Sequence, residues 1–393
     1  MKNGRLIYFI LALIIGVIFA FLSRQPCDLD IFMDGAKKFQ AGSNPYGGPY
    51  IRDLQYYYSP FFAMALSFFS WLPIEVLKFT WMVLILFALW RIAYLFKPYF
   101  PMPVWNKRTR LWIGMVMALS AYFVWLNIIA TQMTVFIVWA AFESMKMASE
   151  KKAISAGLLL GLFINIKLLL LPFLAYLVYR GYFRTAIFTV LAFILFLLLP
   201  AMYVGWQHNL DLLSMWWDSV NPKNPEHIIE RGSGWHSLSA MLPKYISTEN
   251  LSKVLLASRL ALIALTLFFL NTKPFTASRS PLFQFRELSY LCLVIILIFP
   301  HQRYYSYFLL VPAFTYLSFF FMFHFRAISK IMGYISLLIF ILCLLILFLG
   351  KDLVPDDFYS WMYRYGLMTW AVIGMIPSLG ILIPKGIDER ITA

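Results

Sequence analysis

The sequence predicts an all-α polytopic membrane protein, on two observations. Of its 393 residues, 62% are hydrophobic and 13% are charged, whereas a soluble domain is nearer half apolar and a quarter charged. Runs of roughly 20 apolar residues, the length a helix needs to cross about 30 Å of hydrocarbon, recur along the whole chain. We therefore expect residues 1–393 to form one integral membrane domain with about 11 to 13 spans.

The charge and the cysteines fit this class of protein. A net charge of +15 would suggest nucleic acid in a soluble chain, but here the cations lie in short links between apolar runs, as the positive-inside rule requires. Nucleic-acid binding is therefore not expected. Cys27, Cys292 and Cys343 have no metal-ligand spacing, and two of them lie within apolar runs, so a disulfide framework is not expected either.

The first apolar run, residues 6–22, follows Lys2 and Arg5 and resembles a signal peptide. No small-residue cleavage site follows it, and the run is long. We interpret it as a retained first membrane helix with its N-terminus in the cytoplasm.

The second half of the chain gives the clearer topology, because basic inner links alternate with acidic or polar outer links. Working back from the C-terminus, we expect helices at 361–383, 331–350, 304–322, 286–299, 251–271 and 185–204. This threading leaves residues 205–250 as a large polar loop on the outer side.

In the first half, residues 153–180 hold two short apolar runs that are interrupted near Lys167 and flanked by cations. We interpret them as a hairpin that turns at Lys167. Residues 110–124 and 132–147 form a second pair with an outer tip near Gln132. Residues 60–96 are too long for one span and short for two, and Pro73 splits them, so their first part is expected to dip into the membrane or to cross it.

The first outer loop, residues 24–59, contains the candidate base. It opens with Asp28 and Asp30, and the amphipathic pattern from Ile31 to Gln40 predicts a short helix on the membrane surface. A carboxylate at the membrane–water boundary is partly desolvated and suits general-base chemistry on an acceptor hydroxyl. The alternative is an acid that only caps this helix.

Two further polar residues fall at predicted outer turns. Lys167 lies in an apolar segment, where a cation at mid-membrane costs roughly 2.5–3.5 kcal/mol, so it is expected to have a partner or a ligand; otherwise it snorkels to the surface. Gln132 is a candidate hydroxyl-binding amide.

The remaining candidates lie in two outer segments. His301 and Arg303 in PHQRYYSY suit a phosphate leaving group, the Arg by charge-assisted hydrogen bonds and the His by proton donation; they also suit simple interfacial anchoring. Arg231, Trp235 and His236 in ERGSGWHSLSAMLP fit either an aromatic belt or a carbohydrate site.

Several nucleotide, metal and redox motifs do not occur in the sequence: the Walker loop, the Rossmann GxGxxG, HExxH and CxxC. ATP-driven pumping is therefore unsupported, and the chain is too small to carry the soluble catalytic domain of a nucleotide-sugar enzyme.

A series of short motifs follows a recognisable order along most of the chain. It runs through Asp28-Leu29, Ile31-Phe32, Gly35-Ala36, Gly42, Pro45-Tyr46, Tyr58-Ser59-Pro60-Phe61, Gln132, Ala156-Gly157, Gly161, Lys167, Trp235-His236-Ser237-Leu238 and Pro300-His301. This order resembles the GT-C class of polyprenyl-phosphate-sugar glycosyltransferases, and within it glycosyltransferase family 87, a bacterial alpha-mannosyltransferase-like family. The resemblance implies a GT-C-like helix bundle.

The resemblance also implies an activity, the transfer of a hexose from a polyprenyl-phosphate donor to a glycan or glycolipid acceptor on the non-cytoplasmic face. Mannose is the first candidate for this hexose. By position Asp28 is the base, with Asp30 as the alternative. Lys167 and His301 would contact the donor phosphate, together with Arg303. Asp28-x-Asp30 has the spacing to hold a divalent ion, but the mannosyl-type enzymes work without metal, so no cofactor is expected.

The candidate substrate-binding residues are Tyr58, Gln132, Trp235, His236 and Arg231. The chain departs from the family pattern twice. Ala130-Thr131 replaces the Gly expected before Gln132, and Trp235-His236 replaces Asn-Gln; these changes leave the sugar and the acceptor open.

Two other classes of function share some of these features. A transporter or flippase of lipid-linked sugars would have the same spans, but such proteins often show paired halves with broken helices, and no convincing repeat is present. A non-catalytic assembly subunit is the third interpretation. The expected location is a bacterial cytoplasmic (inner) membrane, with the site facing the non-cytoplasmic side.

Overall fold

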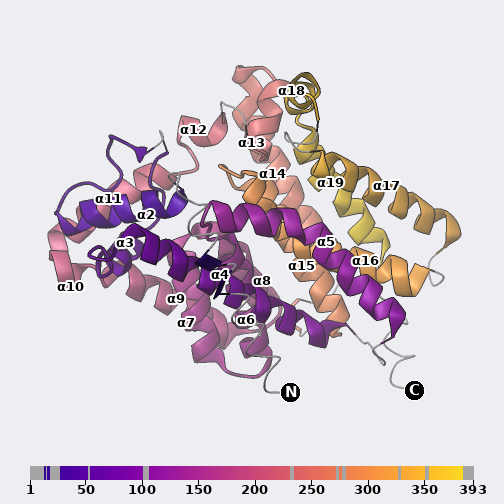
Figure 1. The fold of residues 1–393 in the computed structure, drawn as a ribbon, viewed down its shortest axis with the longest axis horizontal. Helices are drawn as coiled ribbons and strands as arrows, with labels where there is room; N and C mark the ends of the chain where they lie inside the picture. Colours follow the sequence, from indigo (N-terminus) through magenta and orange to yellow (C-terminus); the bar gives the residue numbers. More distant parts are fainter. Residues whose placement is uncertain are drawn as a thin grey trace. The chain divides into compact units, whose positions relative to one another are not determined.

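The structure is a computed structural model that describes residues 13–14, 16–17, 27–51, 54–100, 106–230, 234–270, 274–276, 280–325, 329–349 and 354–383. In these residues the chain forms helices and turns without a strand (Figure 1). Seven of the helical stretches found there are long and apolar enough to cross a membrane, and three shorter apolar helices accompany them. The all-α polytopic membrane class is therefore confirmed. The predicted helix at 6–22 falls largely outside the described residues, and the total of 11 to 13 spans stays a prediction.

The chain divides into two compact units, Met1–Leu95 with Val124–Asn221 and Phe96–Phe123 with Pro222–Ala393. That residues 1–393 act as one membrane domain stays a prediction. The first unit contains α2 (Asp28–Gln40), α3 (Pro60–Ser67), α4 (Ile74–Phe96), the end of α5 (Lys107–Ile129), α6 (Thr134–Ser149), α7 (Ala153–Ile166), α8 (Leu171–Tyr179), α9 (Phe183–Leu198), α10 (Ala201–Val204) and α11 (Trp206–Val220).

The predicted amphipathic helix after Asp28 is confirmed as α2, but its apolar face packs on protein. Phe32 lies against the rings of Tyr58 and Phe62, with centroids 4.6 and 5.5 Å away. At Gly35 a Cβ atom would lie 2.6 Å from the Tyr56 ring, so only glycine permits this close approach. The helix is therefore part of the core of its unit, and a role as a surface helix resting on lipid is not what this packing indicates.

Residues 60–96 contain one long helix and one short one. Ser59 begins α3 as its N-cap, accepting a hydrogen bond from the Phe62 N–H, and Pro60 follows at the first helical position. With 8 residues, α3 is about 12 Å long, too short to cross the hydrocarbon alone. Of the two alternatives at Pro73, the dip followed by a single span, α4, matches the structure.

Helices α7 and α9 lie side by side (Figure 1) and touch through two glycines. A Cβ at Gly157 would lie 2.5 Å from Phe188 Cβ, and one at Gly161 would lie 2.7 Å from Ala192 Cβ. Because the contacts advance in the same direction along both helices, the chain must reverse between them. This confirms the hairpin, and its turn is at Lys167, where the backbone becomes extended.

The second unit contains the start of α5, α12 (Pro225–Ile228), α13 (Leu238–Met241), α14 (Thr248–Leu270), α15 (Pro281–Ile298), a 3₁₀ segment (Tyr304–Leu310) leading into α16 (Val311–Phe319), a π turn (Phe320–His324), α17 (Lys330–Phe348), α18 (Asp356–Arg364) and α19 (Leu367–Ile381). Helix α15 packs against α14, α16 and α19, and nearly all of it is buried.

One sequence prediction is wrong in detail. The expected single helix at 361–383 is broken between α18 and α19, because Gly366 adopts a left-handed conformation with φ of 59°. A Cβ at Gly366 would lie 2.8 Å from Met241 Cγ, so close packing explains the glycine. The expected helix at 185–204 is confirmed as the apolar stretch Phe183–Val204, in which a short turn at Pro200 separates α9 from α10.

The segment 205–250 is mostly helical, although its polarity predicted a loop. In α11 the buried residues are Asn209, Leu212, Trp216 and Ser219, which recur at helical spacing and form one buried face. The Trp216 indole N–H donates to the Tyr57 carbonyl at 3.2 Å. This helix therefore covers the end of the first outer loop.

Candidate active site

The start of α2 is joined to the turn between α5 and α6. The Asp28 backbone N–H donates to the Ala130 carbonyl at 3.2 Å, and the Gln132 side-chain amide donates to the Asp28 carboxylate. Gln132 is fully buried, and its side-chain oxygen has no hydrogen-bond partner among the residues that the structure describes. The amide therefore orients the carboxylate and presents an unused acceptor beside it.

Asp30 has a different set of partners from Asp28. Its carboxylate accepts a hydrogen bond from the Cys27 backbone N–H at 2.6 Å, closing the N-terminus of α2. It also lies 3.3 Å from the Lys78 ammonium. A carboxylate engaged in both a cap and an ion pair is poorly suited to accept a proton from a substrate, so the geometry favours Asp28 over Asp30 as the base.

Lys167 joins this group from the break after α7. Its ammonium lies 5.6 Å from the centroid of the Tyr58 ring, within cation–π range, and the Asp28 carboxylate interacts with it electrostatically. The adjacent turns are connected by a 2.7 Å hydrogen bond from the Ser59 hydroxyl to the Asn165 side-chain oxygen. We call Asp28, Tyr58, Gln132 and Lys167 the Asp28 cluster; all four were candidates from the sequence.

Thr131 was missed as a functional residue. It adopts a φ of 48°, a conformation that is a genuine outlier for a β-branched residue. Its hydroxyl accepts a hydrogen bond from the Leu29 backbone N–H at 3.0 Å and lies 3.1 Å from the Cys27 sulfur. The sequence signal was the absence of the expected glycine: the turn keeps the glycine-type conformation, and the threonine uses its side chain to hold α2.

The second unit gathers the other candidates around His301. The Trp235 ring lies 5.1 Å from the His301 ring, and the Arg303 guanidinium lies 4.3 Å from the Trp235 centroid. The His236 backbone N–H donates to the Gln302 carbonyl at 2.8 Å. Arg231 lies outside the described residues.

Glu230 is the second residue that the sequence did not single out. Its buried carboxylate accepts hydrogen bonds from the Ser237 hydroxyl and from the His301 backbone N–H. Burial is the main cause that raises the pKa of Glu230 to about 7, and these two hydrogen bonds and the charge of Arg259 oppose it. We call Glu230, Trp235, His236, His301 and Arg303 the His301 cluster.

His236 is enclosed by aromatic rings. Its ring lies 4.6 Å from that of Tyr304. Burial, with a smaller contribution from the charge of Lys244, lowers the pKa of His236 to about 3. His236 is therefore neutral at physiological pH, and its buried Nε2 atom has no hydrogen-bond partner within the part of the chain that the structure describes.

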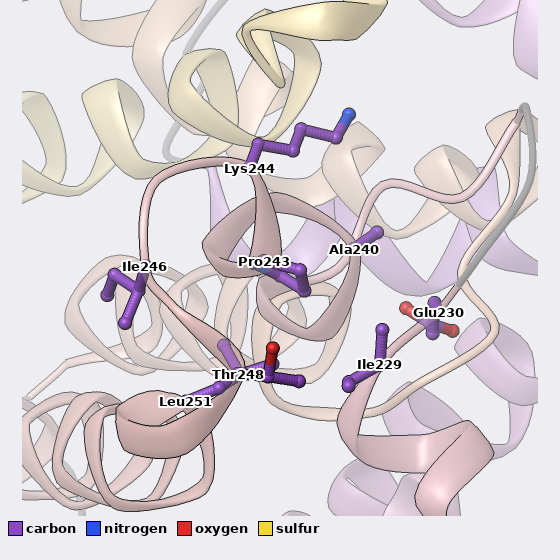
Figure 2. Close-up of a pocket in the computed structure, with 8 residues that line it drawn as sticks. All are labelled: Ile229, Glu230, Ala240, Pro243, Lys244, Ile246, Thr248 and Leu251. Carbon is purple, nitrogen blue, oxygen red and sulfur yellow. The ribbon is translucent and has the colours of Figure 1, made fainter.

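A pocket of about 310 Å³ borders Glu230 (Figure 2). Its other lining residues come from the segment 240–251 and from Ile229, and most of them are apolar. Figure 2 shows the Lys244 side chain extending away from the other lining side chains; its ammonium lies 3.7 Å from the centroid of the Tyr363 ring. Glu230 is thus the acidic edge of a mainly apolar hollow.

The residues that the structure describes contain no group of three His, Cys, Asp or Glu side chains able to hold a metal ion. The Asp28-x-Asp30 pair does not supply one, because the two carboxylates serve different partners. That the protein needs no cofactor stays a prediction.

Comparison with known proteins identifies a family. The family model of glycosyltransferase family 87 matches residues 56–300, which is more than half of the chain and includes Tyr58, Gln132, Lys167 and Trp235. Neither the curated proteins nor the solved structures gave a match. The helical membrane fold agrees with this family. The chain therefore belongs to glycosyltransferase family 87 and is a membrane glycosyltransferase.

Proposed function

We propose that the protein transfers a hexose, with mannose as the first candidate, from a polyprenyl-phosphate donor to a glycan or glycolipid acceptor. The reaction takes place on the non-cytoplasmic face of a bacterial inner membrane. The observation that carries the proposal is the contrast at the start of α2: Gln132 orients the Asp28 carboxylate, whereas Asp30 is engaged by the cap and by Lys78.

In this mechanism Asp28 removes the proton from the acceptor hydroxyl, and the oxygen attacks the anomeric carbon of the donor. The bond from that carbon to the phosphate oxygen breaks, and its electron pair leaves with the lipid phosphate. A single displacement inverts the anomeric configuration. General-base catalysis of this kind contributes about 10²–10⁴-fold.

The leaving phosphate is assigned to the basic side chains. Lys167 supplies a fixed cation in the Asp28 cluster, and His301 and Arg303 supply basic groups in the His301 cluster. Cations in a water-poor site stabilise developing negative charge far more than they would in water. Gln132 and Tyr58, with Trp235 and His236, are proposed to contact the sugars; Arg231, outside the described residues, keeps this role as a prediction.

The test is sugar transfer by the purified protein in nanodiscs, with polyprenyl-phosphate-mannose and a panel of glycan and glycolipid acceptors. We expect Asp28→Asn to lower the rate by at least about a hundredfold. Asp30→Asn, the matched control two residues away, should retain most of the activity of the folded protein.

A loss in Asp30→Asn alone would move the base to Asp30. The absence of product with wild type across several polyprenyl-phosphate sugars would contradict the proposed donor. Glucose transfer in place of mannose would keep the reaction type and correct the sugar.

A further inference from the structure

Glu230 is an acid buried between two polar partners in the second unit. Its side chain has 0% exposure. Both oxygens are used, one by the Ser237 hydroxyl and the other by the His301 backbone N–H. Burying a carboxylate is costly unless it is hydrogen-bonded and paired with positive charge, so its environment indicates a specific role.

The group that faces the carboxylate most directly is the imidazole of His301. Its Nδ1 atom lies 3.4 Å from the same Glu230 oxygen that accepts the His301 backbone N–H. The backbone of His301 has a φ of 59°, a left-handed conformation that non-glycine residues adopt uncommonly. One carboxylate oxygen therefore accepts the His301 main-chain N–H and also lies within ion-pair distance of the His301 ring.

A carboxylate beside one ring nitrogen decides the proton distribution of a histidine. It favours a proton on Nδ1, and it stabilises the doubly protonated imidazolium by charge. With Nδ1 beside Glu230, Nε2 is the ring nitrogen that would face an anionic ligand.

Several other groups contribute to the electrostatics of this pair. The rings of His227 and Trp235 flank His301 at 4.9 and 5.1 Å. Arg259 and Tyr363 interact electrostatically with Glu230. Lys244 lines the adjoining pocket with its stem, and Arg303 stacks on Trp235. Arg259 favours the ionised form of Glu230 against the burial that raises its pKa to about 7, and the ionised carboxylate is the anion beside His301.

We propose that Glu230 is a positioning residue that orients His301 and keeps its imidazole protonated for the phosphate of the lipid-linked donor. This inference rests on the proposed function. As the bond between the anomeric carbon and the phosphate oxygen breaks, its electron pair goes to the phosphate, and the imidazolium stabilises the resulting negative charge. Glu230 itself touches no substrate.

The direct test is a histidine titration by NMR in the intact protein, which needs no substrate. The chain has 5 histidines, so ¹³C labelling of the imidazoles gives few signals, and the spectrum of His301→Gln assigns the signal of His301. In wild type, His301 should titrate above the ordinary value of about 6.5. In Glu230→Gln its pKa should fall by about one to three units, the usual effect of losing an adjacent opposite charge.

Glu226→Gln is the matched control, because it makes the same substitution at an exposed position of α12. It should leave the titration of His301 unchanged. A wild-type pKa for His301 at or below 6.5 would overturn the proposal even if Glu230→Gln failed to fold. An equal pKa in wild type and folded Glu230→Gln would overturn it as well.

Kinetics separate this proposal from the proposed function. The high-pH limb of kcat/KM for the donor should move to lower pH by about one unit or more in Glu230→Gln and stay in place in Glu226→Gln. A limb that stays in place in Glu230→Gln would refute the link to donor phosphate. An NMR shift in a wild-type protein that transfers no sugar would leave the Glu230–His301 pair intact and refute the proposed function.

Discussion

The close contact of α7 with α9 makes a quantitative prediction about Gly157. A methyl group at this position would lie 2.5 Å from Phe188 Cβ and 2.8 Å from the backbone nitrogen of Thr189. Neither neighbour is the flexible end of a side chain, so the helices must separate. Overpacking of this kind costs about 1–3 kcal/mol, more than the roughly 0.5–1 kcal/mol that alanine gains over glycine within a helix.

The assay is thermal unfolding of Gly157→Ala in detergent, compared with Gly114→Ala. Gly114 lies in the exposed face of α5 with no atom within 4 Å of the added methyl group, so only the helix propensity changes there. We expect the Tm to fall by a few degrees for Gly157→Ala and to stay or rise slightly for Gly114→Ala. Equal Tm values for both variants would refute the packing argument.

Two further predictions concern the sites. Thr131→Val should lower the free energy of unfolding by about 1–3 kcal/mol, because it leaves the buried Leu29 N–H without its acceptor. Thr131→Ser keeps the hydroxyl and should not lower it. Equal stability of the two variants in denaturant titrations would contradict this prediction. For His236, the folded pKa of about 3 lies below the unfolded value of about 6.5. Stability from the neutral form is therefore present above pH 6.5 and lost as the pH falls towards 3. His236→Gln should flatten this loss in Tm measured against pH, and a parallel decline in both proteins would argue against it.

The sequence alone predicts the positions of helices and turns where a long apolar run, or a single polar residue within one, marks them. Long apolar runs identify α14 and α17, whose spans are mostly exposed, since a lipid-facing helix needs little beyond length and apolar composition. Lys167 marks the turn after α7 because a cation is costly in an apolar segment. The candidates Asp28 and Gln132 were found through motif order, and the structure brings them together.

The features that the sequence missed depend on long-range contacts. The break at Gly366 reflects packing against Met241, which is far away in the chain, and glycine alone does not specify a left-handed conformation. Glu230 looked like one polar residue in a polar segment. Its importance follows from burial against His301, 71 residues later, which no local pattern reveals.

The parallel pair of α7 and α9 also limits how the molecule can move. Where the backbones of two helices meet at glycines, no layer of side chains separates them. The helices therefore cannot slide or rotate against each other without a clash. The two helices should therefore move as one body, with Lys167 fixed at the end of α7. The neighbouring helix α3 contacts this pair through side chains, with the Phe61 ring 4.8 Å from that of Phe196, so it has more freedom to move against it. Spin labels on α7 and α9 would then report a constant separation, whereas labels on α3 and α9 would report a broader one.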